Sequence, residues 1–87
     1  MLTLTPGVRV LADPTTGRAT LTTPSGQVWL LNATATTAVS ALADGGTVVD
    51  AEAALVRAWP AVPAARLRTD LDALLGTLQQ AGAVTAS

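Results

Sequence analysis

The chain has 87 residues, with five basic residues against six acidic ones, a formal net charge of −1, and neither histidine nor cysteine. This length predicts one small domain over residues 1–87, and the near-balanced charge argues against a nucleic-acid partner. Without histidine and cysteine the chain lacks the commonest general base, the commonest metal ligand and any thiolate, so we expect no enzyme activity, no metal and no cofactor. No apolar run reaches the roughly 18 residues of a membrane span, so no membrane partner is expected.

The first third of the chain has the pattern of three short strands joined by tight turns. Residues 8–13 and 27–31 are rich in β-branched and aliphatic side chains, and residues 18–23 lie between them. The linking segments, 13–17 and 24–26, contain proline and glycine, which favour turns. These features predict a three-stranded antiparallel sheet at the N-terminal end of the domain.

The third strand alternates between two faces because successive side chains of a strand point in opposite directions. Trp29 and Leu31 share one face, which we expect to meet the helices, and Val28 and Leu30 share the other. Val28 and Leu30 are either buried under the N-terminal segment or exposed. Trp29 is either a core aromatic residue or part of a binding surface.

Three helices are expected after the sheet, because the apolar spacing changes from two to three or four residues. The first covers residues 34–44 after the possible cap Asn32, and the second covers 48–59 after a capping box formed by Thr47 and Asp50. The third covers residues 63–81. This order predicts an α+β fold of the winged helix-turn-helix type, with a three-helix bundle after the sheet.

The third helix has the clearest periodicity, with leucines at positions 67, 71, 74, 75 and 78. At about 100° per residue, Leu67, Leu74 and Leu78 fall near the centre of the apolar stripe and are expected to hold the fold. Leu75 falls to one side. The sequence therefore predicts a mixed flank formed by Leu75, Arg68, Asp72 and Gln79.

Several segments of the chain match a family pattern: a hairpin that ends in a Leu-Asn pair, a Thr-Ala step into a helix, an Asp-Gly break before a threonine, and a last helix that closes on glycine and an apolar residue. These features lie at residues 21–35, 44–47, 70–78 and 82–84. In them the chain resembles the PqqD-like family, the RiPP recognition elements. Among these it looks most like the stand-alone proteins that bind the leader of lasso-peptide precursors.

The resemblance implies that a precursor's leader peptide adds antiparallel to the third strand and lays its side chains in the cleft toward the third helix, which is the strand-addition mode. It also implies delivery to a separate, transglutaminase-like leader peptidase, with a cyclase as a possible further partner, in the cytoplasm. A leader tyrosine would occupy the cleft near Leu30, Leu71 and Leu75. The expected peptide-binding residues are Gln27, Val28, Trp29, Leu30, Leu31, Arg68, Leu71, Asp72, Leu75 and Gln79.

Three alternatives stay open. The chain could act as a PqqD-type chaperone in quinone cofactor biosynthesis, as a winged-helix regulator that binds DNA, or as a scaffold. In the regulator the second helix would read DNA, yet it has one arginine, Arg57, beside Asp50 and Glu52. Residues 1–7 and 85–87 are expected to be flexible.

Overall fold

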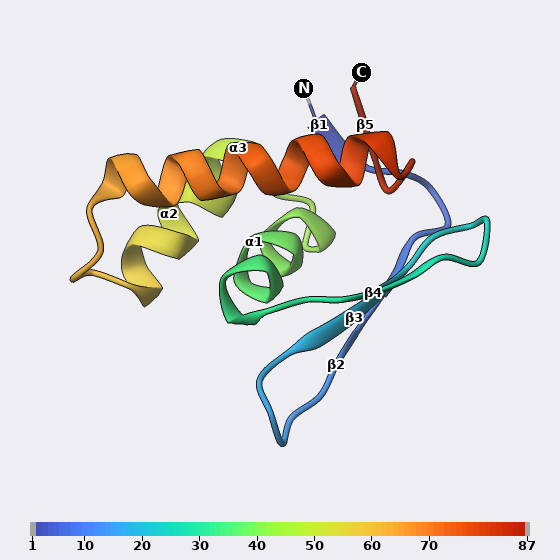
Figure 1. Ribbon diagram of the computed structural model, residues 1–87, viewed down its shortest axis with the longest axis horizontal. Helices are drawn as coiled ribbons and strands as arrows, with labels where there is room; N and C mark the ends of the chain where they lie inside the picture. The colour runs from blue at the N-terminus through green and yellow to red at the C-terminus, as the bar shows by residue number, and fades with distance from the viewer. Residues whose placement is uncertain (1, 87) are drawn as a thin grey trace.

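A computed structural model of the protein describes residues 2–86. Within these residues the chain forms five strands and three helices (Figure 1). The elements in chain order are β1 (Leu2–Leu4), β2 (Arg9–Ala12), β3 (Ala19–Thr22), β4 (Val28–Leu30), α1 (Ala33–Ala43), α2 (Val48–Ala58), α3 (Ala64–Gln80) and β5 (Val84–Ala86). The α+β class is confirmed, with a three-stranded antiparallel sheet followed by three helices.

The helices begin where the sequence predicts caps. Asn32 precedes α1, and its side-chain oxygen accepts the main-chain N–H of Ala35 at 2.8 Å. Thr47 and Asp50 form the predicted capping box of α2, in which the Thr47 N–H donates to the Asp50 carboxylate at 2.8 Å. These contacts satisfy N–H groups that have no partner within the helix, so local sequence fixes where α1 and α2 start.

The three-stranded sheet has the order β2-β3-β4, and its inner face packs against the helices. Val10, Leu21 and Trp29 lie side by side across the three strands on this face, and the central Leu21 is fully buried. The N–H of Ala19 donates to the buried hydroxyl of Thr36 at 2.9 Å, which ties β3 directly to α1. The sheet is thereby held against α1 through its middle strand.

A second sheet, which the sequence pattern does not predict, joins the two ends of the chain. Strands β1 and β5 pair antiparallel, with Thr3 opposite Thr85. Beyond β1, the Thr5 N–H donates to the carbonyl of Ala83 at 2.9 Å, and the Thr5 hydroxyl donates to the carbonyl of Gly82 at 2.6 Å. Flexibility of segments 1–7 and 85–87 stays a prediction, and this pairing argues against it for the described part.

The core lies between the inner face of the sheet and the three helices. Helix α3 packs against α1, α2 and β5, and Figure 1 shows it running along the top of the molecule above α1. The buried side chains are almost all aliphatic, and the largest that are fully buried are Leu21, Val39, Leu71 and Leu78. Burying such side chains stabilises the domain by about 1.5–3 kcal/mol each.

Candidate functional site

Strand β4 forms one edge of the three-stranded sheet, and its main-chain groups alternate in direction. At its two ends, the Gln27 carbonyl accepts and the Leu31 N–H donates a hydrogen bond on the β3 side, each at 2.9 Å. An antiparallel strand bonds a given neighbour through every second residue, so Trp29 also faces β3. The N–H and C=O groups of Val28 and Leu30 therefore point outward, to the open side of the edge.

The side chains of β4 alternate as the sequence predicts. Leu31 is buried and Trp29 packs partly buried against the core, whereas Val28 and Leu30 are 66% and 71% exposed. Burial of Val28 and Leu30 under the N-terminal segment, one of the two alternatives, is wrong because that segment pairs with β5 instead. The exposed pair lies on the face of the sheet opposite to the one that carries Leu21 and Trp29.

Contacts within the β3–β4 hairpin hold the edge strand in place. The hydroxyl of Thr23, a buried residue, accepts the N–H of Gln27 at 3.0 Å and bonds the Ser25 hydroxyl at 2.9 Å. Gly26 has a φ of +92°, a conformation that glycine adopts without a side-chain clash. At the other end of β4, the Arg18 Nε donates to the carbonyl of Leu31 at 3.1 Å. The edge is thus fixed at both ends.

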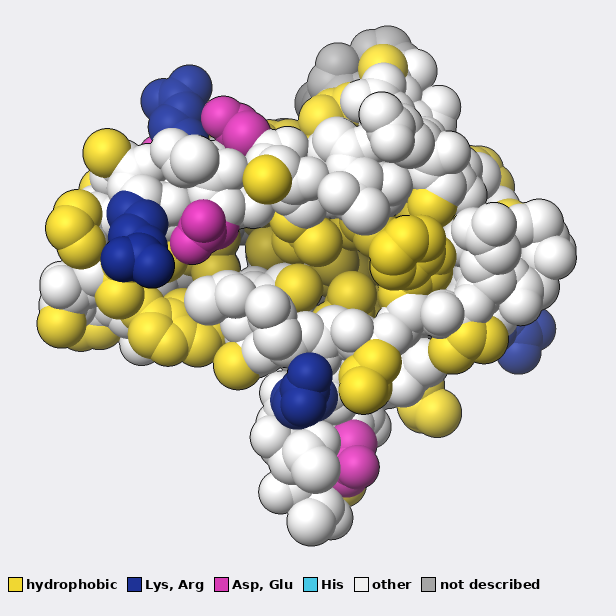
Figure 2. Space-filling model, in the orientation of Figure 1, with side chains coloured by type: hydrophobic (Ala, Val, Ile, Leu, Met, Phe, Trp, Pro, Cys, Tyr) yellow, Lys and Arg dark blue, Asp and Glu magenta, His cyan; other side chains and the backbone are white. Residues whose placement is uncertain are grey.

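An open groove of about 300 Å³ runs between β4 and α3. We call it the β4–α3 groove, and its lining residues are Trp29, Leu30, Leu31, Asn32, Ala35, Ala73, Leu74, Thr77 and Leu78. Figure 2 shows this side of the molecule, where a hollow with hydrophobic side chains in its floor lies below α3. The outward main-chain groups of β4 lie along this groove.

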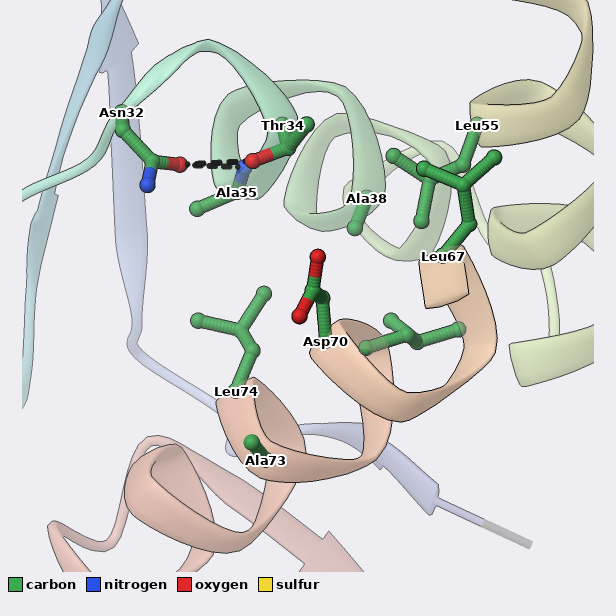
Figure 3. A pocket seen from close by; sticks show the side chains of 10 residues that line it. Asn32, Thr34, Ala35, Ala38, Leu55, Leu67, Asp70, Ala73 and Leu74 are labelled. Atoms are coloured by element: carbon green, nitrogen blue, oxygen red, sulfur yellow. Dashed lines mark hydrogen bonds between the residues drawn. The ribbon is translucent and has the colours of Figure 1, made fainter. Parts of the chain in front are cut away.

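At the α1 end the groove continues into a pocket of about 350 Å³ between α1 and α3 (Figure 3). We call it the Asp70 pocket, and its lining residues are Asn32, Thr34, Ala35, Ala38, Leu55, Leu67, Asp70, Leu71, Ala73 and Leu74. Four of these, Asn32, Ala35, Ala73 and Leu74, also line the β4–α3 groove. The two hollows therefore form one continuous surface that an extended ligand could follow.

The flank of α3 that meets this surface is opposite to the expected one. Leu75 is 4% exposed and belongs to the core, whereas Leu74 is only partly buried and lines both hollows. The helix is rotated so that Leu67, Leu71, Leu75 and Leu78 face inward. The stripe of five leucines on α3 is wider than the surface that α1, α2 and β5 cover. The position of these three elements therefore decides which side of the stripe stays exposed. Leu75 therefore belongs to the core and Leu74 to the open flank, the reverse of the expected placement.

The predicted site residues divide into three groups. Trp29, Leu30 and Leu31 line the groove, and Val28 and Gln27 continue the same strand edge. Leu71 lines the Asp70 pocket. The other four lie outside both linings, with Leu75 buried and Arg68, Asp72 and Gln79 exposed.

Four residues of the α3 wall, Asp70, Ala73, Leu74 and Thr77, were missing from the expected set. They are three or four residues apart and so share one flank of the helix. Helical periodicity shows that these residues share a flank, but it does not show which flank of the helix stays uncovered.

The indole nitrogen of Trp29 is an unusual polar group beside the groove. Trp29 Nε1 is buried and has no hydrogen-bond partner within residues 2–86. An unsatisfied buried donor costs about 1–3 kcal/mol.

The family comparison covers most of the chain. The model of the family described as coenzyme PQQ synthesis protein D (PqqD) matches residues 9–84. The chain belongs to the PqqD family. Domains of this family are small peptide-binding partners in the biosynthesis of ribosomally made peptides, and they are generally non-catalytic. The comparisons with curated proteins and with solved structures found no match.

Three further features concern the classes of partner. Among residues 2–86, no cluster of three or more acidic, histidine or cysteine side chains could hold a metal ion. None of the helices in the same residues has the length and apolar character needed to cross a membrane. On α2, the helix that a DNA-binding regulator would use, Val49 is 73% exposed and Val56 is 40% exposed beside a single arginine, Arg57.

Proposed function

We propose that this PqqD-family domain binds the leader region of a precursor peptide as an additional strand on β4. The observation that carries the proposal is the open edge of β4 beside an apolar groove, with the main-chain groups of Val28 and Leu30 directed outward. Exposed sheet edges bind extended peptides in this way, through main-chain hydrogen bonds for affinity and pockets for specificity.

Strand addition assigns each peptide residue to one side. Residues opposite Val28 and Leu30 would exchange hydrogen bonds with β4 and turn their side chains to the outer face. Residues opposite Trp29 and Leu31 would turn theirs into the β4–α3 groove, toward Leu74. Specificity for the leader would therefore come from every second residue.

The interaction energies suit a protein that binds and then releases its peptide. Four main-chain hydrogen bonds contribute about 0.5–1.5 kcal/mol each, and two buried apolar side chains about 1.5–3 kcal/mol each. Ordering the flexible peptide costs about 2–5 kcal/mol or more. The upper end of this balance, about 7–10 kcal/mol, corresponds to dissociation constants from about 10 μM to about 50 nM.

In the cell, the domain would present the bound leader to a separate enzyme. The segment from Trp29 to Asn32, which joins β4 to α1, resembles that of lasso-peptide leader-binding proteins. We therefore favour a lasso-peptide precursor as the ligand, with a transglutaminase-like leader peptidase as the receiving enzyme, a cyclase as a further partner, and the cytoplasm as the location. Cleavage would be carried out by the peptidase, and this chain would hold the substrate.

The description of the matching family supports a second candidate, a chaperone of the precursor in quinone cofactor synthesis. It would use the same strand edge and groove. The two candidates differ in the precursor that binds, so a side-by-side titration with leader peptides of both kinds separates them.

An N-methyl scan of the leader peptide tests the binding mode. The probe is a fluorescein-labelled leader peptide of a lasso-peptide precursor, and the unlabelled core peptide of the same precursor serves as the control. Methylation of residues opposite Val28 and Leu30 should weaken binding about tenfold or more, because it removes a donor and blocks the edge. Methylation of the residues between them should have little effect.

The period of two in this scan is the decisive feature. A leader that does not bind, or that binds with equal losses at neighbouring positions, would overturn strand addition. Tight binding of the core peptide alone would overturn the assignment of the leader as the ligand.

A further inference from the structure

The combined surface of the groove and the pocket carries one charge among the described residues that line it, the carboxylate of Asp70. Figure 3 shows this side chain rising from α3 toward Ala38 of α1, beside Leu74. The other polar groups nearby are partly occupied. The side-chain oxygen of Asn32 accepts from the Ala35 N–H at 2.8 Å and from the Thr34 hydroxyl at 3.0 Å. Among the described residues that line this surface, Asp70 thus offers a ligand the one charged acceptor.

We propose that the Asp70 pocket selects a lysine or arginine side chain of the bound peptide. This inference rests on the proposed function and names a feature of its ligand. The walls contributed by Leu55, Leu71 and Leu74 suit the aliphatic stem of such a side chain, while its charged end reaches the carboxylate. A shorter or acidic side chain would leave the stem contacts or the charge unmatched.

The position of the pocket orders the peptide. Strand β4 runs from Val28 toward Asn32, and Asn32 lines both the groove and the pocket. A peptide that pairs antiparallel with β4 runs the opposite way, so its N-terminal part lies near Asn32. The basic residue should therefore precede, in the peptide, the apolar residue that contacts Trp29.

A basic peptide residue at Asp70 has the opposite charge to the acidic residue that a contact with Arg68 would select. Arg68 is exposed and lies outside the lining of both hollows, so an acidic peptide residue has no partner there in the groove.

A purely structural role for Asp70 is the competing explanation. Helix α1 has no acidic residue in its own first turn, and a carboxylate near a helix N-terminus stabilises the helix dipole. Such a role would affect the melting temperature of the protein and leave its choice of peptide unchanged. The two explanations therefore give different results with the same variant.

The test is a selection of random linear peptides by mRNA display against the full chain, Asp70→Asn and the matched control Asp72→Asn. Asp72 is an exposed carboxylate on α3 outside the groove. The parent and Asp72→Asn should enrich a basic residue ahead of an apolar one, and Asp70→Asn should enrich the apolar residue alone. In the best peptide, replacing the basic residue with norleucine should weaken binding to the parent about two- to fivefold and leave binding to Asp70→Asn unchanged.

Each result decides between the inference and the function on which it rests. Enriched peptides without a basic residue, or with one that persists in Asp70→Asn, overturn the inference and leave strand addition standing. A lower melting temperature of Asp70→Asn with an unchanged peptide preference assigns Asp70 to the stability of α1 and also overturns it. A parent protein that enriches no peptide overturns the proposed function, and the inference with it.

Discussion

The two flanks of α3 carry adjacent leucines with opposite roles. Leu75 is 4% exposed in the core, whereas Leu74 stands about 100° further round the helix, partly exposed, in the wall of the groove. On the flank of Leu75 the neighbouring side chains are Arg68, Asp72 and Gln79, which are exposed to solvent. On the flank of Leu74 they are Ala73 and Thr77, which line the groove. The comparison shows that the neighbouring elements decide which of two adjacent leucines is buried and which is left partly exposed beside the groove.

The largest difference between the flanks should appear in stability. Leu75→Ala should lower the free energy of unfolding by about 2–5 kcal/mol, because it leaves a cavity in a packed core. Leu74→Ala should cost about 1 kcal/mol, since part of its side chain is already in water. Urea denaturation of the two variants measures both values, and equal losses would contradict the assignment of the flanks.

One buried hydrogen bond, from the Ala19 N–H to the Thr36 hydroxyl, joins β3 to α1. Thr36→Val should lower the free energy of unfolding by about 1–3 kcal/mol, because the N–H of Ala19 would lose its partner. The matched control is Thr37→Val, whose exposed hydroxyl bonds the Ala33 carbonyl within α1. Thermal melts should separate the two variants by several degrees, and a Thr36→Val protein as stable as the control would show that the sheet is not held to α1 in this way.

For peptide affinity, in contrast to stability, we expect the flank of Leu74 to matter more than the flank of Leu75. Leu74→Ala should weaken binding of the labelled leader about tenfold, which is about 1.4 kcal/mol, because an apolar contact is lost. Val49→Ala on the outer face of α2 is the control and should bind like the parent. Anisotropy titrations that show the larger loss for Val49→Ala would move the binding surface to α2.

The smallest effect is expected at Arg68. Arg68→Glu should change the affinity for the leader by less than about twofold at ordinary salt, because this exposed side chain lies outside the groove. A large loss that shrinks as salt rises would bring the charged flank of α3 back into the site.

Much of the fold follows from local patterns in the sequence. The caps at Asn32 and Thr47 and the turn residues 24–26 are short-range signals, and the structure confirms the predicted strands and helices to within one or two residues at most ends. Strands β1 and β5 are different. Each has only three residues, and they pair across nearly the whole chain, so local pattern does not reveal them.

Part of the site also follows from local patterns in the sequence. The alternation of β4 follows from the period of a strand, and it gives Trp29 and Leu31 on one face and Val28 and Leu30 on the other. The choice between Leu74 and Leu75 depends on how α1, α2 and β5 surround α3, which a helical wheel does not contain. Asp70 was missed for the same reason, because its flank is identified as a pocket wall only once α1 is in place.

Amide hydrogen exchange at three consecutive residues tests strand addition on β4 most directly. The N–H of Trp29 faces β3, whereas those of Val28 and Leu30 face the open edge. Saturation with the leader peptide should slow exchange at Val28 and Leu30 about tenfold or more and leave Trp29 nearly unchanged. Unchanged exchange at Val28 and Leu30 in the saturated complex would contradict the proposal that the peptide binds as an added strand.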